Sequence, residues 1–200
     1  MKIAVLANDY QWKEINCAGE QVDYFRIGSI GNIPVAIDAL IILQEQLMTD
    51  FNLTAKPIFF NSVSTTLKEM DAAPNVFRIN GWNGFLARNT WEVAGAVNEP
   101  IRQMLHALGK NTIEVPDEPG LVSARIIAMI INEAYFALED KISTIEEIDI
   151  AMKLGTNYPY GPFEWASLIG TDKILTLLQK LANQDKRYLP APLLKAAITV

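Results

Sequence analysis

Residues 116–140, PDEPGLVSARIIAMIINEAYFALED, decide how this chain is organised. The stretch opens with two prolines and a glycine within five residues, a composition that suits neither a helix nor a strand. From residue 121 it is apolar around most of a helical circumference, so it predicts a helix buried by several neighbours or by another subunit. We therefore place a domain boundary here, with one domain over 1–115 and a second over 116–200.

The second domain is predicted to be entirely helical. Residues 143–147, STIEE, hold overlapping capping-box patterns that start a helix over 145–154, which Gly155 is expected to end. Residues 158–170, YPYGPFEWASLIG, combine a proline–glycine turn with a short amphipathic helix. Two further helices are expected after it, the first ending near residue 184.

The first domain alternates short apolar runs with turn signals. Six runs have the length of a strand, at 2–7, 22–27, 39–43, 57–63, 75–80 and 111–115. Most are continuously apolar, as strands covered on both faces are, which indicates an α/β sheet. Helices are expected over 43–51 and 92–108, the second closed by Gly109.

Composition excludes several classes of function. The 200 residues are 50% hydrophobic and 20% charged with a net charge of -6, the balance of a soluble globular protein, and no basic run marks a nucleic-acid footprint. No apolar run reaches the roughly 20 residues that cross a bilayer, and charges soon after residue 7 argue against a signal peptide. We therefore expect a cytoplasmic protein with no nucleic-acid and no membrane partner.

The chain has one cysteine, Cys17, and one histidine, His106. A single cysteine permits no intramolecular disulfide and no cysteine-rich zinc site, so no metal site is predicted. Histidine is the commonest proton carrier near neutral pH, but His106 has helical neighbours and no Asp, Ser or Cys arranged to work with it. We interpret His106 as a structural helix residue.

A strand at the start of an α/β chain raises the hypothesis of a dinucleotide site. Such a site needs Gly-x-Gly-x-x-Gly after the strand, so that backbone amides can approach the pyrophosphate. Residues 8–20, NDYQWKEINCAGE, lack glycines at the required places. Gly28 and Gly31 follow the second run, but Pro34 comes before a helix can start. The sequence therefore predicts no cofactor-binding residues.

Four motifs follow one another in the second half of the chain. They are Asp-x-Pro-Gly at 117–120, Asn-Glu-Ala at 132–134, Ile-Asp-x-Ala-Met-Lys-x-Gly at 148–155 and Gly-Pro-Phe-Glu at 161–164. In this order they closely resemble the C-terminal domain of the 3-hydroxyacyl-CoA dehydrogenase family, which includes 3-hydroxybutyryl-CoA dehydrogenases. The resemblance covers the chain from residue 116 to about residue 194 and implies homodimerisation through these helices.

A weaker resemblance extends upstream. PIFFNSVSTTL, residues 57–67, is similar to the family's Ser-Asn-Thr-Ser segment and places Ser62 at its substrate-side serine. VFRINGWNGFLARNTWEV, residues 76–93, is similar to the segment that carries the catalytic histidine. On that register Asn80 replaces the histidine, and Glu92 falls on the glutamate that orients it. Ala124, in GLVSAR, stands where the family has an active-site asparagine.

The resemblance implies a shortened Rossmann-like sheet domain, several tens of residues shorter than the family's, followed by a helical dehydrogenase C-terminal domain. Asparagine exchanges no proton near pH 7, so Asn80 removes the base that takes the hydroxyl proton, at a cost of about 10²- to 10⁴-fold in rate. The missing glycine fingerprint implies that NAD, the family's cofactor, is not expected to bind.

Three functions stay open, and with them whether the chain is an enzyme. The first is a divergent family member that lacks NAD binding and the catalytic histidine but retains homodimerisation and acyl-CoA binding, with Ser62, Asn80 and Glu92 facing the ligand. The second is an active NAD-dependent 3-hydroxyacyl-CoA dehydrogenase of fatty-acid metabolism with a relocated base, either Glu92 or a lysine. The third is a dimeric structural or interaction protein without a ligand, in which Ser62 caps a turn and Glu92 starts a helix.

Overall fold

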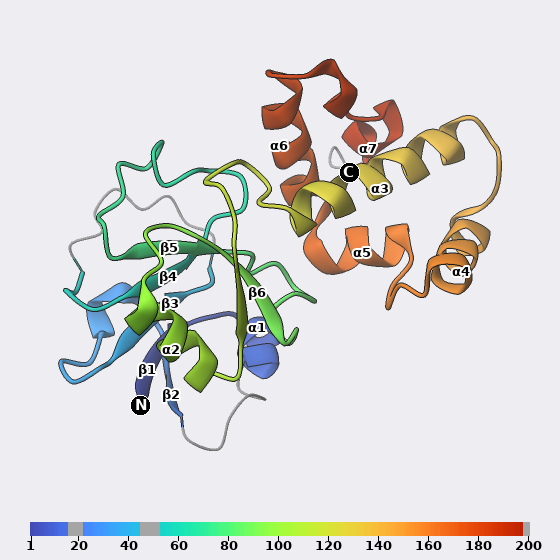
Figure 1. Cartoon of the computed structure of the whole chain (residues 1–200). Coiled ribbons are helices and arrows are strands. Elements are labelled where there is room, and N and C mark those ends of the chain that lie inside the picture. Colours follow the sequence, from blue (N-terminus) through green and yellow to red (C-terminus); the bar gives the residue numbers. More distant parts are fainter. Residues whose placement is uncertain (16–21, 45–52, 198–200) are drawn as a thin grey trace. The chain divides into compact units, whose positions relative to one another are not determined.

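A computed structural model describes residues 1–15, 22–44 and 53–197. The chain divides into two compact units, Met1–Leu121 and Val122–Val200, coloured blue to green and yellow to red in Figure 1. The helix expected over 43–51 and the single cysteine lie, wholly or almost wholly, outside the described residues.

The first unit is built on a seven-stranded sheet with the order β2-β1-β3-β4-β5-β6-β7. In chain order the strands are β1 (Lys2–Leu6), β2 (Asp23–Ile27), β3 (Ala39–Ile42), β4 (Ile58–Asn61), β5 (Val76–Ile79), β6 (Thr90–Ala94) and β7 (Asn111–Glu114). All neighbours pair in parallel except β5 and β6. The predicted α/β sheet is confirmed.

The strand order identifies the edge of the sheet where ligands bind in folds of this kind. The chain proceeds to one side of β1 through β2 and to the other side through β3, so the direction reverses between β1 and β3. A complete dinucleotide fold has the order 3-2-1-4-5-6, with two strands outside the central one on that side. The described part of this sheet has only β2 there, which is the predicted shortening of the Rossmann-like domain.

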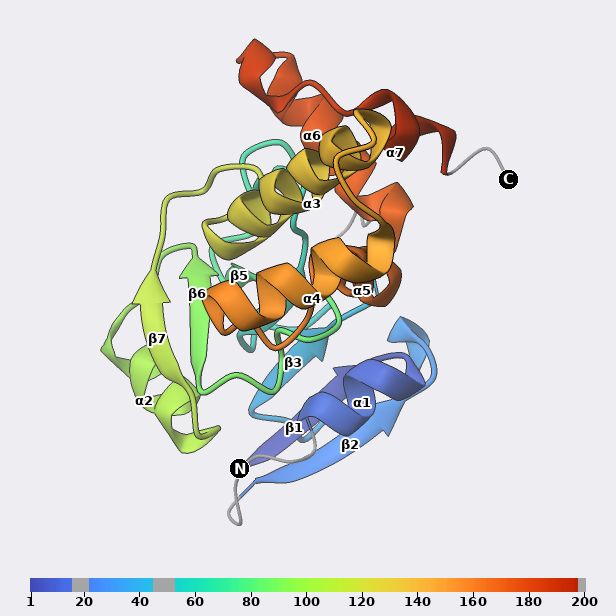
Figure 2. The ribbon, with the colours of Figure 1, turned by 90° about the vertical axis from the view of Figure 1, so that its right-hand side faces the viewer.

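Apolar clusters cover both faces of the sheet. Alternate residues of β1 point to opposite faces, with Ile3 and Val5 in one cluster and Ala4 and Leu6 in the other. Two helices, α1 (Asp9–Ile15) and α2 (Glu99–Ala107), add side chains to the first cluster, and Figure 2 shows α1 beside β1 and β2. Side chains from connecting segments, such as Leu67 and Met70, pack against the second.

The predicted helix over 92–108 was wrong in its first part, because residues 90–94 form strand β6. Trp91 and Val93 are buried while Thr90 is exposed, which is the alternation of a half-buried strand. The helix α2 starts only at Glu99, where the side chain of Asn98 accepts a hydrogen bond from the Ile101 amide. Helix α1 was not predicted, because its seven residues form too short a run to show a clear helical period.

The second unit is all-helical, as predicted. Its helices are α3 (Ser123–Glu139), α4 (Ile145–Thr156), α5 (Pro162–Ile169), α6 (Thr171–Ala182) and α7 (Pro192–Ala196). The capping box of α4 is present, between Thr144 and Glu147. Gly155 does not end α4 as expected, because the helix runs to Thr156 and closes on Asn157 in a left-handed conformation, with φ of 55°. Within the described residues no helix is both long and apolar enough to cross a bilayer.

Two of the motifs that carry the resemblance act together in this unit. The carboxylate of Asp149, on α4, accepts hydrogen bonds from the amides of Phe163 at 2.8 Å and Glu164 at 3.2 Å. It thus caps α5 from another helix. A Cβ on Gly161 would stand 2.3 Å from Asp149 Oδ1, so only glycine fits before α5. Lys153 Nζ adds an ion pair with Glu164 at 2.5 Å.

A third motif has a similar structural role. The buried side chain of Asn132, on α3, donates to the Leu189 carbonyl at 3.0 Å and accepts from the Ala191 amide at 2.8 Å. Both partners belong to the segment that leads into α7. The Asn-Glu-Ala motif therefore fastens the end of the helical unit to its central helix.

Candidate active site

The structure brings three of the four predicted site positions to one edge of the sheet. Strands β4 and β5 pair Asn61 with Ile79, and continuing this parallel register by one residue places Ser62 beside Asn80. Strands β5 and β6 pair Ile79 with Val93, and continuing that antiparallel register places Asn80 opposite Glu92. Ser62 and Asn80 are each the first residue after a strand, and with Glu92 on β6 they take neighbouring register positions.

Ser62 and Asn80 are both buried and hydrogen-bonded. The hydroxyl of Ser62, 8% exposed, donates to the Thr65 carbonyl at 2.7 Å. The side-chain oxygen of Asn80, 7% exposed, accepts from the Trp82 amide at 3.1 Å. The fourth position, Ala124, is a fully buried residue of α3 in the other unit.

Glu92 stands in the field of an arginine instead of a histidine. Burial lowers the pKa of the Arg88 guanidinium, while the carboxylates of Glu92 and Glu14 act in the opposite direction. The Arg88 guanidinium also lies over the Phe85 ring, 4.1 Å from its centroid. The sequence pattern gave no sign of this charge pair, because Arg88 lies in the loop between the two strands.

The loop after β5 is packed into the protein. Gly81 donates its amide to Asn61 Oδ1 at 2.9 Å, and a Cβ on Gly81 would come within 2.7 Å of the Asn61 side chain. Trp82 is buried, and both oxygens of Glu14 accept from the Gly84 amide, at 2.9 and 3.1 Å. Burial raises the pKa of that carboxyl. This loop is therefore held by β4 on one side and by α1 on the other.

The turn between β1 and α1 is where a dinucleotide fold binds pyrophosphate, and here side chains fill it. Only Ala7 and Asn8 separate the strand from the helix. Asn8 Oδ1 accepts from the Gln11 amide at 2.8 Å, and Gln11 Oε1 accepts from the Asn8 amide at 3.1 Å. Gln11, 1% exposed, also donates through Nε2 to the carbonyls of Leu43 at 2.9 Å and Gly81 at 3.0 Å.

Two opposite charges are paired at this turn. Asp9 places a carboxylate in the first turn of α1, where a pyrophosphate would otherwise meet free amides. Arg26 at the end of β2 pairs with Asp9 at 2.7 Å and donates to the Ala7 carbonyl at 3.1 Å, so it closes the same turn from the other side. These residues do not fit NAD in the manner of a dinucleotide-binding turn.

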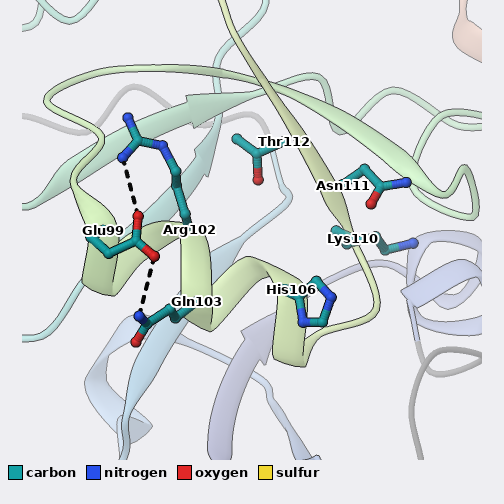
Figure 3. A pocket seen from close by; sticks show the side chains of 7 residues that line it. All are labelled: Glu99, Arg102, Gln103, His106, Lys110, Asn111 and Thr112. Atoms are coloured by element: carbon teal, nitrogen blue, oxygen red, sulfur yellow. Dashed lines mark hydrogen bonds and ion pairs between the residues drawn. The ribbon is translucent and has the colours of Figure 1, made fainter.

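A hollow of about 450 Å³ lies elsewhere on this unit, between α2 and β7. Figure 3 shows its lining side chains, among them His106. Gln103 Nε2 donates to Glu99 at 3.2 Å, and Arg102 pairs with Glu99 at 3.6 Å. These three side chains of the hollow therefore bind one another. His106 is an exposed residue of α2 here, apart from the edge that holds Asn80. The described residues contain no cluster of His, Cys, Asp and Glu suited to a metal ion.

Similarity to known proteins agrees with the geometry. Residues 120–199 match the family model described as 3-hydroxyacyl-CoA dehydrogenase, C-terminal domain. Over 109 residues the chain is 43% identical to 3-hydroxyadipyl-CoA dehydrogenase of Escherichia coli (strain K12), a match that covers 51% of this chain and 23% of that protein. Over 97 residues it is 38% identical to a probable 3-hydroxybutyryl-CoA dehydrogenase of Bacillus subtilis, covering 48% of this chain and 34% of the relative. The match thus spans only a quarter to a third of these relatives.

Solved structures show the same fold. An (S)-3-hydroxybutyryl-CoA dehydrogenase from Ralstonia eutropha superposes with a TM-score of 0.71 at 18% identity, covering 99% of this chain and 93% of that one. A 3-hydroxybutyryl-CoA dehydrogenase from Escherichia coli K12 gives a TM-score of 0.58 at 32% identity, covering 70% and 31%. The molecule is thus of the class that joins a Rossmann-like sheet to a helical dehydrogenase domain. The helical domain thus belongs to the 3-hydroxyacyl-CoA dehydrogenase family.

Proposed function

We propose that this chain binds a coenzyme A thioester without oxidising it by the NAD-dependent route of its family. The observation that carries the proposal is the β1–α1 turn, which is closed by the reciprocal Asn8–Gln11 bonds and the Asp9–Arg26 pair. A pyrophosphate would have to displace the Asn8 and Gln11 side chains and to compete with the Asp9 carboxylate for Arg26. Both steps oppose binding.

The same sheet edge supports recognition of an acyl group. Asn80 carries an amide of the kind that orients a carbonyl oxygen, and the neighbouring Glu92 carboxylate accepts from a hydroxyl. The Ser62 hydroxyl donates to the Thr65 carbonyl, so on binding it would turn from that carbonyl to the ligand oxygen. None of this supplies a base equivalent to histidine at the position of Asn80. The relatives named above act on 3-hydroxyacyl thioesters of coenzyme A, so a 3-oxoacyl or 3-hydroxyacyl thioester is the ligand class to expect.

Homodimerisation belongs to the same proposal. Ile150 and Leu154 lie four residues apart on α4, hence on one face of that helix, and are 53% and 83% exposed. Ile126 on α3 is also half exposed. Apolar side chains gathered on a helical unit favour association with a second copy. Light scattering after size exclusion should give twice the mass of the chain, and Leu154→Glu should reduce it toward the monomer, whereas a monomeric wild type would contradict this part.

Calorimetric titration separates the three functions. Acetoacetyl-CoA should bind saturably, NADH should not, and mixing both with the protein should leave the NADH absorbance unchanged. Ser62→Ala should weaken acetoacetyl-CoA binding, whereas His106→Ala, a variant in the distant hollow, should not. NADH consumption would instead establish the active dehydrogenase with a relocated base. Absence of any thioester binding would favour the structural or interaction protein.

A further inference from the structure

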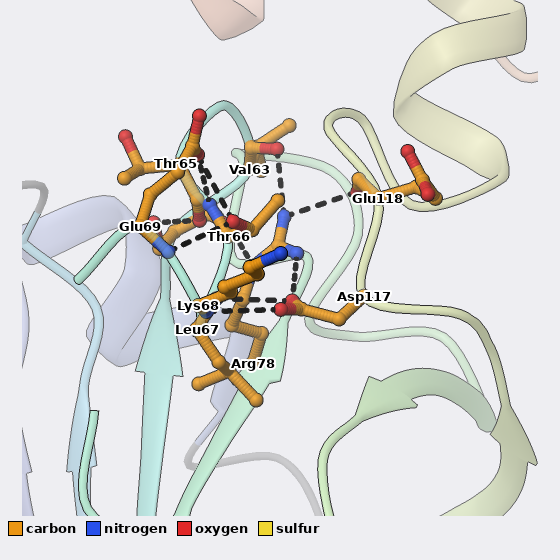
Figure 4. A network of polar contacts seen from close by, with 10 residues as sticks. Val63, Thr65, Thr66, Leu67, Lys68, Glu69, Arg78, Asp117 and Glu118 are labelled. Atoms are coloured by element: carbon orange, nitrogen blue, oxygen red, sulfur yellow. Dashed lines mark hydrogen bonds and ion pairs between the residues drawn. The ribbon is translucent and has the colours of Figure 1, made fainter. Parts of the chain in front are cut away.

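Arg78 is a fully buried arginine in the middle of the sheet unit, at 0% exposure on β5. Its Nε donates to the Ser62 carbonyl at 2.8 Å, and its Nη2 donates to the carbonyls of Val63 at 3.0 Å and Glu118 at 3.3 Å. Its Nη1 bonds to Asp117 Oδ1 at 2.5 Å. A buried guanidinium is costly unless it is paired, and here every nitrogen has a partner (Figure 4).

Asp117 connects Arg78 to a second part of the chain, the segment that contains Leu67 and Lys68. It lies in the linker, residues 116–120, and its carboxylate accepts from the amides of Leu67 at 3.0 Å and Lys68 at 3.2 Å. The Gly120 amide donates to the Val63 carbonyl at 2.8 Å. Two segments far apart in sequence, the Ser62 loop (residues 62–68) and the linker, are thus joined at several points through one guanidinium and one carboxylate.

These contacts end where the chain leaves the sheet unit. Gly120 and Leu121 have φ of 84° and 47°, and a left-handed leucine is strained by roughly 1 kcal/mol or more. The helical unit begins at the next residue, Val122. The linker is therefore anchored to the sheet unit up to its last residue.

We propose that Arg78 and Asp117 form a clasp through which the linker sets the position of Ser62. Arg78 is then a positioning residue, since it binds the successive carbonyls of Ser62 and Val63 and does not itself reach a ligand. The clasp rests on contacts within the sheet unit alone. Its effect on a ligand rests on the thioester binding proposed above.

Amide hydrogen exchange tests the clasp without any ligand. Asp117→Asn keeps the shape of the side chain and removes its charge, and Arg78→Lys serves as the second variant. Both segments, 62–68 and 117–120, should exchange about tenfold faster together, while the amides of β3 keep their protection. Glu114→Gln breaks the exposed Arg102–Glu114 pair and is the matched control, with no change expected in either segment. Faster exchange confined to Leu67 and Lys68, or unchanged exchange, overturns the clasp.

Affinity for acetoacetyl-CoA tests whether the clasp acts through Ser62. Asp117→Asn should weaken binding about tenfold in the wild-type background and scarcely at all in a Ser62→Ala background, because the two changes remove the same contact. Additive losses overturn the positioning role. If the wild type binds no thioester, the proposed function fails, and the exchange experiment still decides whether the clasp exists.

Discussion

Replacing Gln11 by methionine tests the closed turn most sharply through stability. Methionine has nearly the same length and volume, so the change removes hydrogen bonds while leaving little cavity. Lost are the bonds from Gln11 Nε2 to the Leu43 and Gly81 carbonyls and the bond from the Asn8 amide. At about 1 kcal/mol each, the sheet unit should lose about 3 kcal/mol of unfolding free energy. The Leu43 carbonyl keeps its bond from Asn61 at 2.8 Å, so a larger loss is not expected.

Urea unfolding followed by tryptophan fluorescence measures this loss. In a Trp165→Phe background the remaining tryptophans all belong to the sheet unit. The midpoint of thermal unfolding should fall by about 10 °C, given the dependence expected for a unit of this size. Gln103→Met is the control, because Gln103 is an exposed residue that bonds only across the surface to Glu99, and it should change stability by less than about 0.5 kcal/mol. A Gln11→Met variant as stable as this control would refute the closed turn.

Three further changes have signs that follow from the structure. Burial acts to raise the pKa of Asp117, but hydrogen bonds from the Leu67 amide and from Arg78 outweigh it and lower that pKa. This carboxylate therefore contributes stability that is lost as pH falls below about 4. Acid unfolding of the Asp117→Asn variant should lack that loss. Burial raises the pKa of Glu14, so the contribution of this carboxyl to stability declines as pH rises above about 4.5. At pH 7 the urea midpoint of Glu14→Gln should therefore be higher than that of the wild type. A lower midpoint would show that the charge itself holds the Gly84 amide. Asp149→Ala removes the hydrogen-bond partner of two amides at the start of α5 and should cost the helical unit about 2 kcal/mol of unfolding free energy, measured by Trp165 fluorescence. The control Glu139→Ala should cost little. Equal losses in the two variants would exclude the interhelical cap.

The helical unit could be predicted well from the sequence because its signals are local. Capping residues and proline positions fixed most of its helices, and the capping box at Thr144 is present as expected. The reason for the Gly161 motif could not be predicted in this way. It depends on Asp149, a residue of another helix whose carboxylate fills the space that a Cβ would need.

The sheet unit shows the limits of local patterns more clearly. The helix-forming residues of 99–107 mask the alternation of Trp91 and Val93, so the helix predicted over 92–108 wrongly includes the last three residues of β6. The bonds from Gln11 to the Leu43 and Gly81 carbonyls could not be predicted, because these partners lie 32 and 70 residues away in the chain. The position of Arg78 beneath Ser62 depends on pairing between strands in the same way.

The resemblance supplied the candidate positions, and the strand registers supply their arrangement. The resemblance assigns a family position to each of Ser62, Asn80 and Glu92 separately. The registers of β4, β5 and β6 bring these three positions next to one another. The electrostatic interaction of Glu92 with Arg88 was not predicted, because Arg88 lies outside the strands and its conformation is not set by a strand register.

Titration of the protein with NADH, followed by the fluorescence of the cofactor, tests the central claim most directly. The closed β1–α1 turn predicts no saturable change up to about 1 mM, a concentration at which even a site with a free energy of only about -4 kcal/mol would be half filled. Saturation in the micromolar range, competed by NAD and abolished by a substitution in the turn such as Asn8→Trp, would contradict the account.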